Sequence, residues 1–151
     1  MKPFLLFILS AGLLAAAAPA KVDVYSAAQL HSIAGKLAAK NTPFADTDLA
    51  AYKGHRTMLA VRKATGSAEF HAHDADIFFV VSGSATLVTG GKLVNPKTLK
   101  PGEIRGSSIR GGERHRLSAG DIVHIPARTP HWILVNGGKP FAYFVVKVSD
   151  Q

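Results

Sequence analysis

Apolar residues near the start of the chain recur with the period of an α-helix. From Leu30 to Ala38 they lie at positions i, i+3, i+4, i+7 and i+8, which predicts an amphipathic helix over residues 26–40. Ser26 is a residue type that favours the N-cap position, and Pro43 cannot continue a helix. We therefore expect one helix, packed across the outside of the domain that follows it.

From residue 54 onward the hydrophobic pattern changes to short runs rich in β-branched and aromatic residues. These runs predict strands over residues 57–65, 69–73, 77–81, 85–89, 122–125, 132–135 and 141–148. Turns are predicted between them at residues 82–84, 90–91 and 136–138. The series favours an all-β sandwich or small barrel. We expect an N-terminal helical segment at residues 21–53 and one β domain at residues 54–151.

Residues 95–116 interrupt this pattern with basic side chains, glycine and proline. Six basic residues stand here against Glu103 and Glu113: Lys97, Lys100, Arg105, Arg110, Arg114 and Arg116. The stretch predicts a long surface excursion with a short strand around residues 108–110. It is either a basic lip that recruits or covers an anionic ligand, or a solvated loop.

The start of the chain has the features of a secretory signal peptide. Lys2 precedes an apolar run at residues 4–18, and Ala18-Pro19-Ala20 matches a cleavage site after Ala20. The run is shorter than the roughly 20 residues that span a bilayer, so no stable membrane anchor is expected. The chain has no cysteine to carry a lipid or a disulfide. We expect an exported protein, periplasmic or secreted.

The charge of the chain is strongly positive. Its net charge is +8, and without Lys2 the remaining 17 Lys and Arg against 10 Asp and Glu give +7. This suits an anionic partner, or it serves solubility. Export makes nucleic acid a less natural partner, so we expect none.

Two short segments carry the candidate chemistry. His71 and His73 are two residues apart, so on an extended strand both imidazoles face the same way and can reach one metal ion. Alone, the pair is a weak signal, and exposed or hydrogen-bonded histidines are the more common explanation of such a spacing. The second segment, GDIVHIPARTPH at residues 120–131, places His131 after a stiff proline-containing corner.

Together these segments resemble the two signature motifs of the cupin superfamily. The first is matched by His71, His73, Asp76 and Gly83, and the second by Gly120, Pro126, His131 and, one place late, Asn136. The resemblance implies a double-stranded β-helix, the cupin or jelly-roll β-barrel, with an internal metal. Carried over by position, the ligands are His71, His73, Asp76 and His131. This set suits a divalent transition metal such as Mn, Fe, Ni, Cu or Zn.

Three departures from the motifs matter for this expectation. Asp76 stands where the superfamily has glutamate, and only two residues separate it from His73 instead of three or four. Asp74 and Glu69 are nearby acids, but neither fits the motif position. Arg128 replaces the usual glycine, so a positive φ at this corner would be strained. Asp76 is therefore either the fourth ligand or a brace for the turn.

One further histidine and several functions remain open. His124 is a candidate general base, if it points into the barrel beside the metal, or a half-buried histidine bonded to backbone. The protein is expected to bind a small molecule, for which an anion is one option. It does so either as a metal-dependent dioxygenase, lyase or isomerase or as a non-catalytic small-ligand or carbohydrate-binding cupin. A structural or assembly module is a third reading. The resemblance also implies a homodimer.

Overall fold

The computed structural model describes residues 22–149, so the predicted signal peptide at residues 1–20 lies outside the described residues. The elements are α1 (Ala27–Ala38), β1 (Phe44–Tyr52), β2 (His55–Arg62), β3 (Ala68–His71), β4 (Ala75–Ser82), β5 (Ser84–Thr89), β6 (Lys92–Val94), β7 (Lys97–Lys100), β8 (Glu103–Gly106), β9 (Ser108–Arg110), β10 (Glu113–Ser118), β11 (Ile122–Ile125), β12 (His131–Leu134) and β13 (Phe141–Val148).

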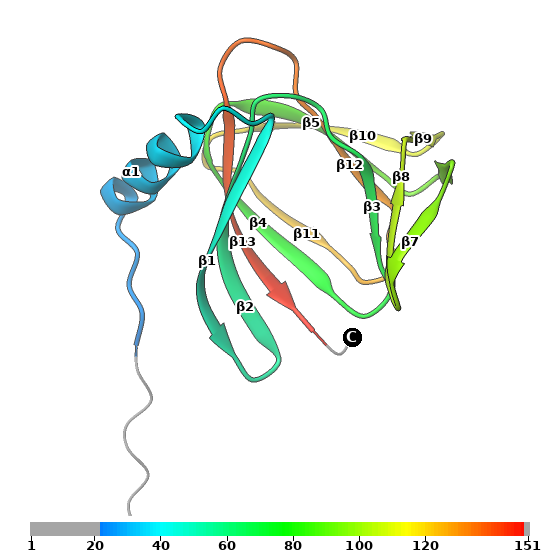
Figure 1. The fold of residues 1–151 in the computed structure, drawn as a ribbon, viewed down its shortest axis with the longest axis horizontal. Helices are drawn as coiled ribbons and strands as arrows, with labels where there is room; N and C mark the ends of the chain where they lie inside the picture. The colour runs from blue at the N-terminus through cyan, green and yellow to red at the C-terminus, as the bar shows by residue number, and fades with distance from the viewer. Residues whose placement is uncertain (1–21, 150–151) are drawn as a thin grey trace, which may run out of the picture.

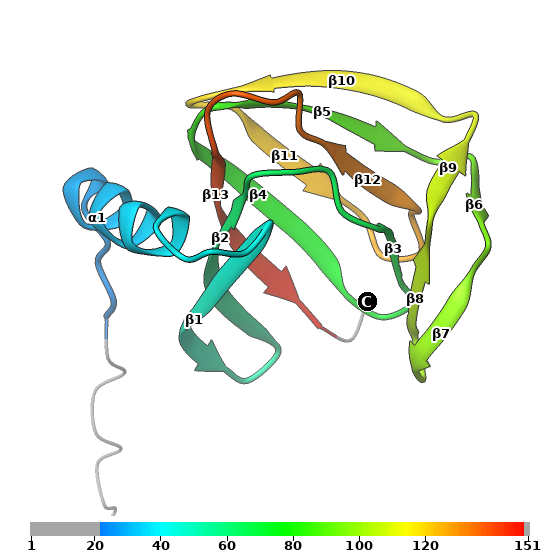
Figure 2. The ribbon, with the colours of Figure 1, turned by 45° about the horizontal axis from the view of Figure 1, so that its top comes forward.

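Two antiparallel sheets face each other and form a barrel (Figure 1). One sheet has five strands in the order β1-β2-β13-β4-β11, and the other has six in the order β10-β5-β12-β3-β8-β7. A two-stranded ribbon, β6-β9, lies at the far side of the barrel from the helix (Figure 2). This arrangement confirms the predicted all-β double-stranded β-helix with one N-terminal helix.

The strands of the five-stranded sheet bury apolar side chains on both faces. Along β2, Met58 and Ala60 face the interior of the barrel, while Leu59 and Val61 face outward, as the two-residue period of a strand requires. The interior cluster takes residues from both sheets: Met58, Ala60, Phe78, Val80, Ala85, Leu87, Leu117, Ile125, Ile133, Phe141, Tyr143 and Val145. This cluster fills one part of the barrel and leaves the rest for polar groups.

Helix α1 covers the outer face of the five-stranded sheet (Figure 2). Ser26 caps it in a capping box with Gln29, which confirms the predicted N-terminus. Leu30, Ala34 and Leu37 are buried against outward-facing side chains of the sheet such as Leu59. Within residues 22–149 no helix is long and apolar enough to cross a membrane.

The turn between β4 and β5 requires the glycine that the first motif predicts. Gly83 has φ +79°, and a Cβ atom there would lie 2.3 Å from the carbonyl oxygen of Pro140. Any larger residue would push this turn away from the start of β13.

Two expectations about the sheets need correction. The five-stranded sheet begins at Phe44, not at residue 54, because the segment expected to be helical also contains β1. Residues 95–116 are not a loop, although the strand expected at residues 108–110 is present as β9. They contain β7, β8, β9 and most of β10, and β8 pairs with β3 beside the candidate site.

Candidate metal and ligand site

Strand β3 presents two polar side chains to the interior of the barrel. Glu69 and His71 are two residues apart and lie on the same face of this short strand. β3 ends at His71, and the chain then turns, with the Ala72 N–H donating to the Gly102 carbonyl at 2.8 Å. His73 therefore lies beyond the strand, where its side chain is exposed and lies against Gly102.

The neighbouring strands bring two further groups to this pair. His131 on β12 stands directly opposite Glu69 in the register of the six-stranded sheet. Asp76 comes from β4 in the facing sheet, and its Oδ2 lies 3.4 Å from His71 Nε2 and 3.6 Å from His131 Nε2. Glu69 Oε2 lies 3.5 Å from His71 Nε2. Two imidazoles and two carboxylates thus converge from both sheets.

Both imidazoles are held by the ring nitrogen that faces away from this centre. His71 Nδ1 lies 2.8 Å from Glu103 Oε1, across the β3–β8 pair. His131 Nδ1 donates to the Thr129 carbonyl at 3.0 Å. A hydrogen bond at Nδ1 leaves Nε2 as the nitrogen that can bind a metal, and such bonds orient metal-binding histidines in many proteins.

The corner before β12 helps to hold both histidines. Arg128 adopts φ +63°, in the left-handed region, and its N–H donates to the His71 carbonyl at 2.7 Å. Arg128 therefore adopts the positive φ that the motif's usual glycine would adopt more easily. The backbone of residues 128 and 129 thus contacts His71 and His131 in turn.

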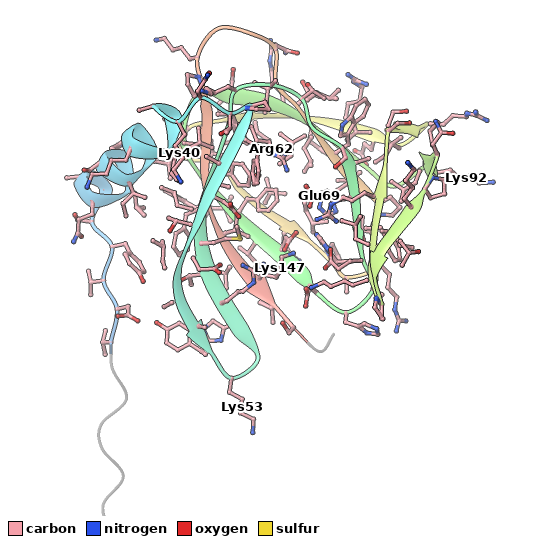
Figure 3. All side chains as sticks on the ribbon, in the orientation of Figure 1. Lys40, Lys53, Arg62, Glu69, Lys92 and Lys147 are labelled. Carbon is pink, nitrogen blue, oxygen red and sulfur yellow. The ribbon has the colours of Figure 1, made fainter. Side chains whose placement is uncertain are left out.

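Three cationic side chains surround the acids of the centre. Arg62 Nη2 lies 2.7 Å from Glu69 Oε1, and Arg105 Nη2 lies 3.3 Å from Glu69 Oε2. Lys147 Nζ donates to Asp76 Oδ1 at 2.5 Å. In Figure 3, Arg62, Glu69 and Lys147 point into the barrel, whereas Lys53 points away from it.

These contacts shift the pKa values of the buried groups. Burial opposes protonation of His71, but the nearby Asp76 and Glu69 outweigh it and raise its pKa from 6.5 to about 9. Burial lowers the pKa of His131. Burial disfavours the charged form of Glu69, but His71 and the two arginines hold its pKa well below its usual range. For Asp76, His71 and Lys147 overcome burial and lower the pKa.

The donor atoms suit a metal ion. Ligand atoms of Glu69, His71 and His131 all lie within 4.8 Å of one another. Metal–ligand bonds of about 2.1 Å place neighbouring ligand atoms roughly 3–4 Å apart, as the distances from Asp76 and Glu69 to the imidazoles are here. His71 Nε2 is also buried without a hydrogen-bond partner among the described residues. This orphaned nitrogen is the atom that a metal would bind.

The structure gathers part of the predicted ligand set and replaces another part. His71, Asp76 and His131 come together, but His73 does not join them. Glu69 lies in the centre in place of His73. The sequence feature that could have indicated Glu69 is its two-residue spacing to His71. The metal ligands themselves stay a prediction.

His124 and the charged neighbours of the centre also differ from expectation. Val123 and Ile125 pack into the interior, so His124 faces outward and is exposed, which fits neither a general base beside the metal nor a half-buried histidine. Sequence reasoning did not find Arg62, Glu103 or Lys147, because only the pairing of distant strands brings them to the centre.

The centre opens into a cavity of about 360 Å³ between the sheets. Its polar lining includes Glu69, Asp76, His131 and the three cations, and its apolar lining includes Phe78 and Ile133. A volume of this size suits a small organic molecule.

Comparisons with known proteins agree with this architecture. Residues 105–147 match the family described as the cupin domain. No curated protein matches the chain. The fold is similar to that of an uncharacterized conserved protein with a double-stranded β-helix domain from Klebsiella pneumoniae (16% identity, 87% of this chain, 93% of that chain, TM-score 0.58). It is also similar to a provisionally assigned mannose-6-phosphate isomerase from Ralstonia eutropha (18% identity, 72% of this chain, 88% of that chain, TM-score 0.52). A third similar structure is KdgF from Halomonas sp. (14% identity, 72% of this chain, 82% of that chain, TM-score 0.52).

At these identities the solved structures show the fold alone. The matched domain and the shared double-stranded β-helix confirm the resemblance to the cupin superfamily. The chain therefore has the cupin fold, with a candidate metal site of histidine and acidic residues inside its barrel.

Proposed function

We propose that this protein is a metal-binding cupin that holds a small molecule in the cavity between its sheets. The observation that carries the proposal is His71 Nε2, which is buried, has no hydrogen-bond partner among residues 22–149, and faces the Glu69 and Asp76 carboxylates. The nearby acids raise the pKa of His71 to about 9, so a metal bound at Nε2 would take the place of a proton between the same two carboxylates.

The proposed ligands are His71, His131 and Glu69, with Asp76 as the fourth donor. Glu103 and the Thr129 carbonyl orient the two imidazoles. When bound, a divalent transition metal would supply a Lewis acid that polarises an oxygen of the ligand. The donor set of imidazole and carboxylate suits Mn, Fe, Ni, Cu or Zn.

If the protein is an enzyme, the surroundings of the centre favour a reaction that moves a proton, as lyases and isomerases do. Lys147 carries transferable protons and lies beside the centre, hydrogen-bonded to Asp76. Tyr143 lies in the same cavity with its hydroxyl buried. Dioxygenase activity is the alternative among metal-dependent reactions of this fold.

Metal analysis of untagged protein, reconstituted separately with Mn, Fe, Ni, Cu and Zn, tests the proposal. We expect close to one metal per chain in the native protein and a large loss in His71→Ala and in Glu69→Gln. His73→Ala and His124→Ala are the matched controls, because both side chains are exposed. Less than about 0.1 metal per chain with every ion would end the proposal. Loss of metal in His73→Ala instead would favour the motif-based ligand set.

A non-catalytic cupin that binds a small ligand or carbohydrate without metal is the second candidate. The observation that favours it is the pairing of Glu69 with Arg62 and of Asp76 with Lys147, which already neutralises both acids. In that case His71→Ala would keep ligand binding.

Two further parts of the proposal rest on the sequence. We propose export after cleavage at Ala20, checked by the N-terminal residue of the protein recovered from its native cells. We also propose a homodimer, checked by light scattering of the purified protein.

A further inference from the structure

The hydrogen-bonding groups around the cavity point to the chemical class of its ligand. We infer that the ligand is a small organic acid with oxygen acceptors at both ends, bound by Lys147 at one position and by Tyr143 with Arg62 at another. This inference rests on the proposed binding of a small molecule in the cavity. The unused donors of Lys147 and Tyr143 carry it without the metal, and the charge argument adds to it only with the metal bound.

Lys147 provides unused hydrogen-bond donors in a buried position. Its side chain enters the cavity from β13, and its residue is 8% exposed. An ammonium group has three hydrogens to donate. Among the described residues only Asp76 accepts one of them. The other two are available to a ligand oxygen in the cavity.

Tyr143 offers another donor on the same strand face. Its hydroxyl oxygen accepts a hydrogen bond from Arg62 Nε at 3.0 Å. The hydroxyl hydrogen has no acceptor within residues 22–149, and the residue is only 4% exposed. Burial raises the pKa of Tyr143 to about 12, so the hydroxyl keeps its hydrogen at neutral pH. A buried donor without a partner is costly, and a ligand oxygen would satisfy it.

With the proposed metal bound, the charges of the site would also call for an anion. Arg62, Arg105 and Lys147 are balanced by Glu69, Asp76 and Glu103, three cations against three acids. A divalent metal held by these acids would leave the buried site with a charge of +2. Buried net charge is costly unless it is paired, and an acid with two negative oxygens would balance it.

The shape of the cavity limits the size of the acid. Its 360 Å³ lie at the small end of ligand pockets. Met58, Phe78, Ile133 and Val145 also line it and offer contacts to a short carbon skeleton. A small dicarboxylate or hydroxy acid fits this combination.

Binding of matched acids and amides tests the inference. We expect malate and succinate to raise the melting temperature in a saturable way, while their neutral diamides do not. Tyr143→Phe should weaken acid binding about fivefold or more, and Lys147→Gln about tenfold, measured by calorimetric titration. Tyr25→Phe and Lys53→Gln change the same residue types outside the cavity, and both should leave acid binding unchanged.

Three results would overturn the inference: diamides that bind as well as the acids, acids that do not bind the native protein at about 10 mM, or unchanged affinity in Tyr143→Phe. The acid–amide comparison needs only native protein, so it decides the question even if Lys147→Gln fails to fold. Metal content measured on the same samples separates the two proposals. Acid binding without metal would end only the metal centre, and metal without acid binding would end only this inference.

Discussion

The two ring nitrogens of His71 have different surroundings, and the difference defines what this residue can do. Nδ1 is fixed by Glu103 at 2.8 Å, whereas Nε2 faces Glu69 and Asp76 at 3.5 and 3.4 Å without a hydrogen bond. The acids favour a positive charge on the ring and raise its pKa to about 9. A proton and a metal ion therefore compete for the same nitrogen.

This competition predicts that metal uptake strengthens as the pH rises. Because the pKa is raised, the charged ring stabilises the metal-free fold fully below pH 6.5, and this stabilisation is lost as the pH rises through about 9. Metal binding must displace that proton, so affinity should rise by up to about tenfold per pH unit between pH 6 and pH 8. Calorimetric titration in two buffers of different ionisation heat would measure the released proton.

The exposed His73 supplies the control for this prediction. His73→Ala should keep both the affinity and its pH dependence, because the ring lies outside the centre. Equal metal affinity at pH 6 and pH 8 in the native protein would contradict the competition at His71.

At the scale of elements, the end of β3 decides which residues form the site. The sequence predicted a strand through His73, and on such a strand His71 and His73 would share a face. The Ala72 N–H still donates to the Gly102 carbonyl in register with β8, but the chain bends at residues 72–73, and the strand ends at His71. The two-residue period then pairs His71 with Glu69 instead. The period was applied correctly, but the strand ends at a bend of the chain after His71, which no local pattern revealed.

For helix α1, in contrast to β3, the local sequence pattern was sufficient to predict the element. Its apolar period and its Ser26 cap predicted both its existence and its buried face. It lies on the outer face of the five-stranded sheet, away from the cavity, so it should contribute stability and not binding.

Leu37→Ala tests this separation of roles. The side chain is 4% exposed, and its truncation should lower the free energy of unfolding by about 2–5 kcal/mol, measured by urea denaturation. Metal content per folded chain should stay at the native value. Lys36→Ala, on the exposed side of the same turn, should change stability little. A loss of metal in Leu37→Ala at full folding would show that the helix shapes the centre.

For the whole molecule, the sequence predicted the barrel better than its edges. Each of the seven predicted strands is present, because their apolar residues face either the interior or the helix. β1, β6, β7, β8 and β10 were missed, whereas the strand expected at residues 108–110 is present as β9. β1 is an edge strand and β7 is fully exposed, so neither carries a strong hydrophobic pattern. Their place is set by pairing with β2 and β8.

The centre joins the two sheets, and this predicts a stability effect for the entire barrel. Glu69, His71 and His131 belong to the six-stranded sheet, whereas Asp76 belongs to the five-stranded sheet. A metal bound only by the folded protein at about 100 times its Kd adds about 2.7 kcal/mol, or roughly 5–15 °C in Tm for a domain of this size. Thermal unfolding with and without a chelator would measure this shift.

The variants of the centre show which sheet contributes to that shift. Glu69→Gln should abolish it, because one of the proposed ligands is lost. Asp76→Asn should reduce it, since the bridge to the five-stranded sheet is weakened while the three donors of the other sheet remain. If Asp76→Asn kept the full metal-dependent rise in Tm, the metal would be bound by the six-stranded sheet alone. Asp76 would then be only the partner of Lys147. An unchanged Tm of the native protein on chelation, at confirmed metal loading, would contradict the coupling of the centre to the fold.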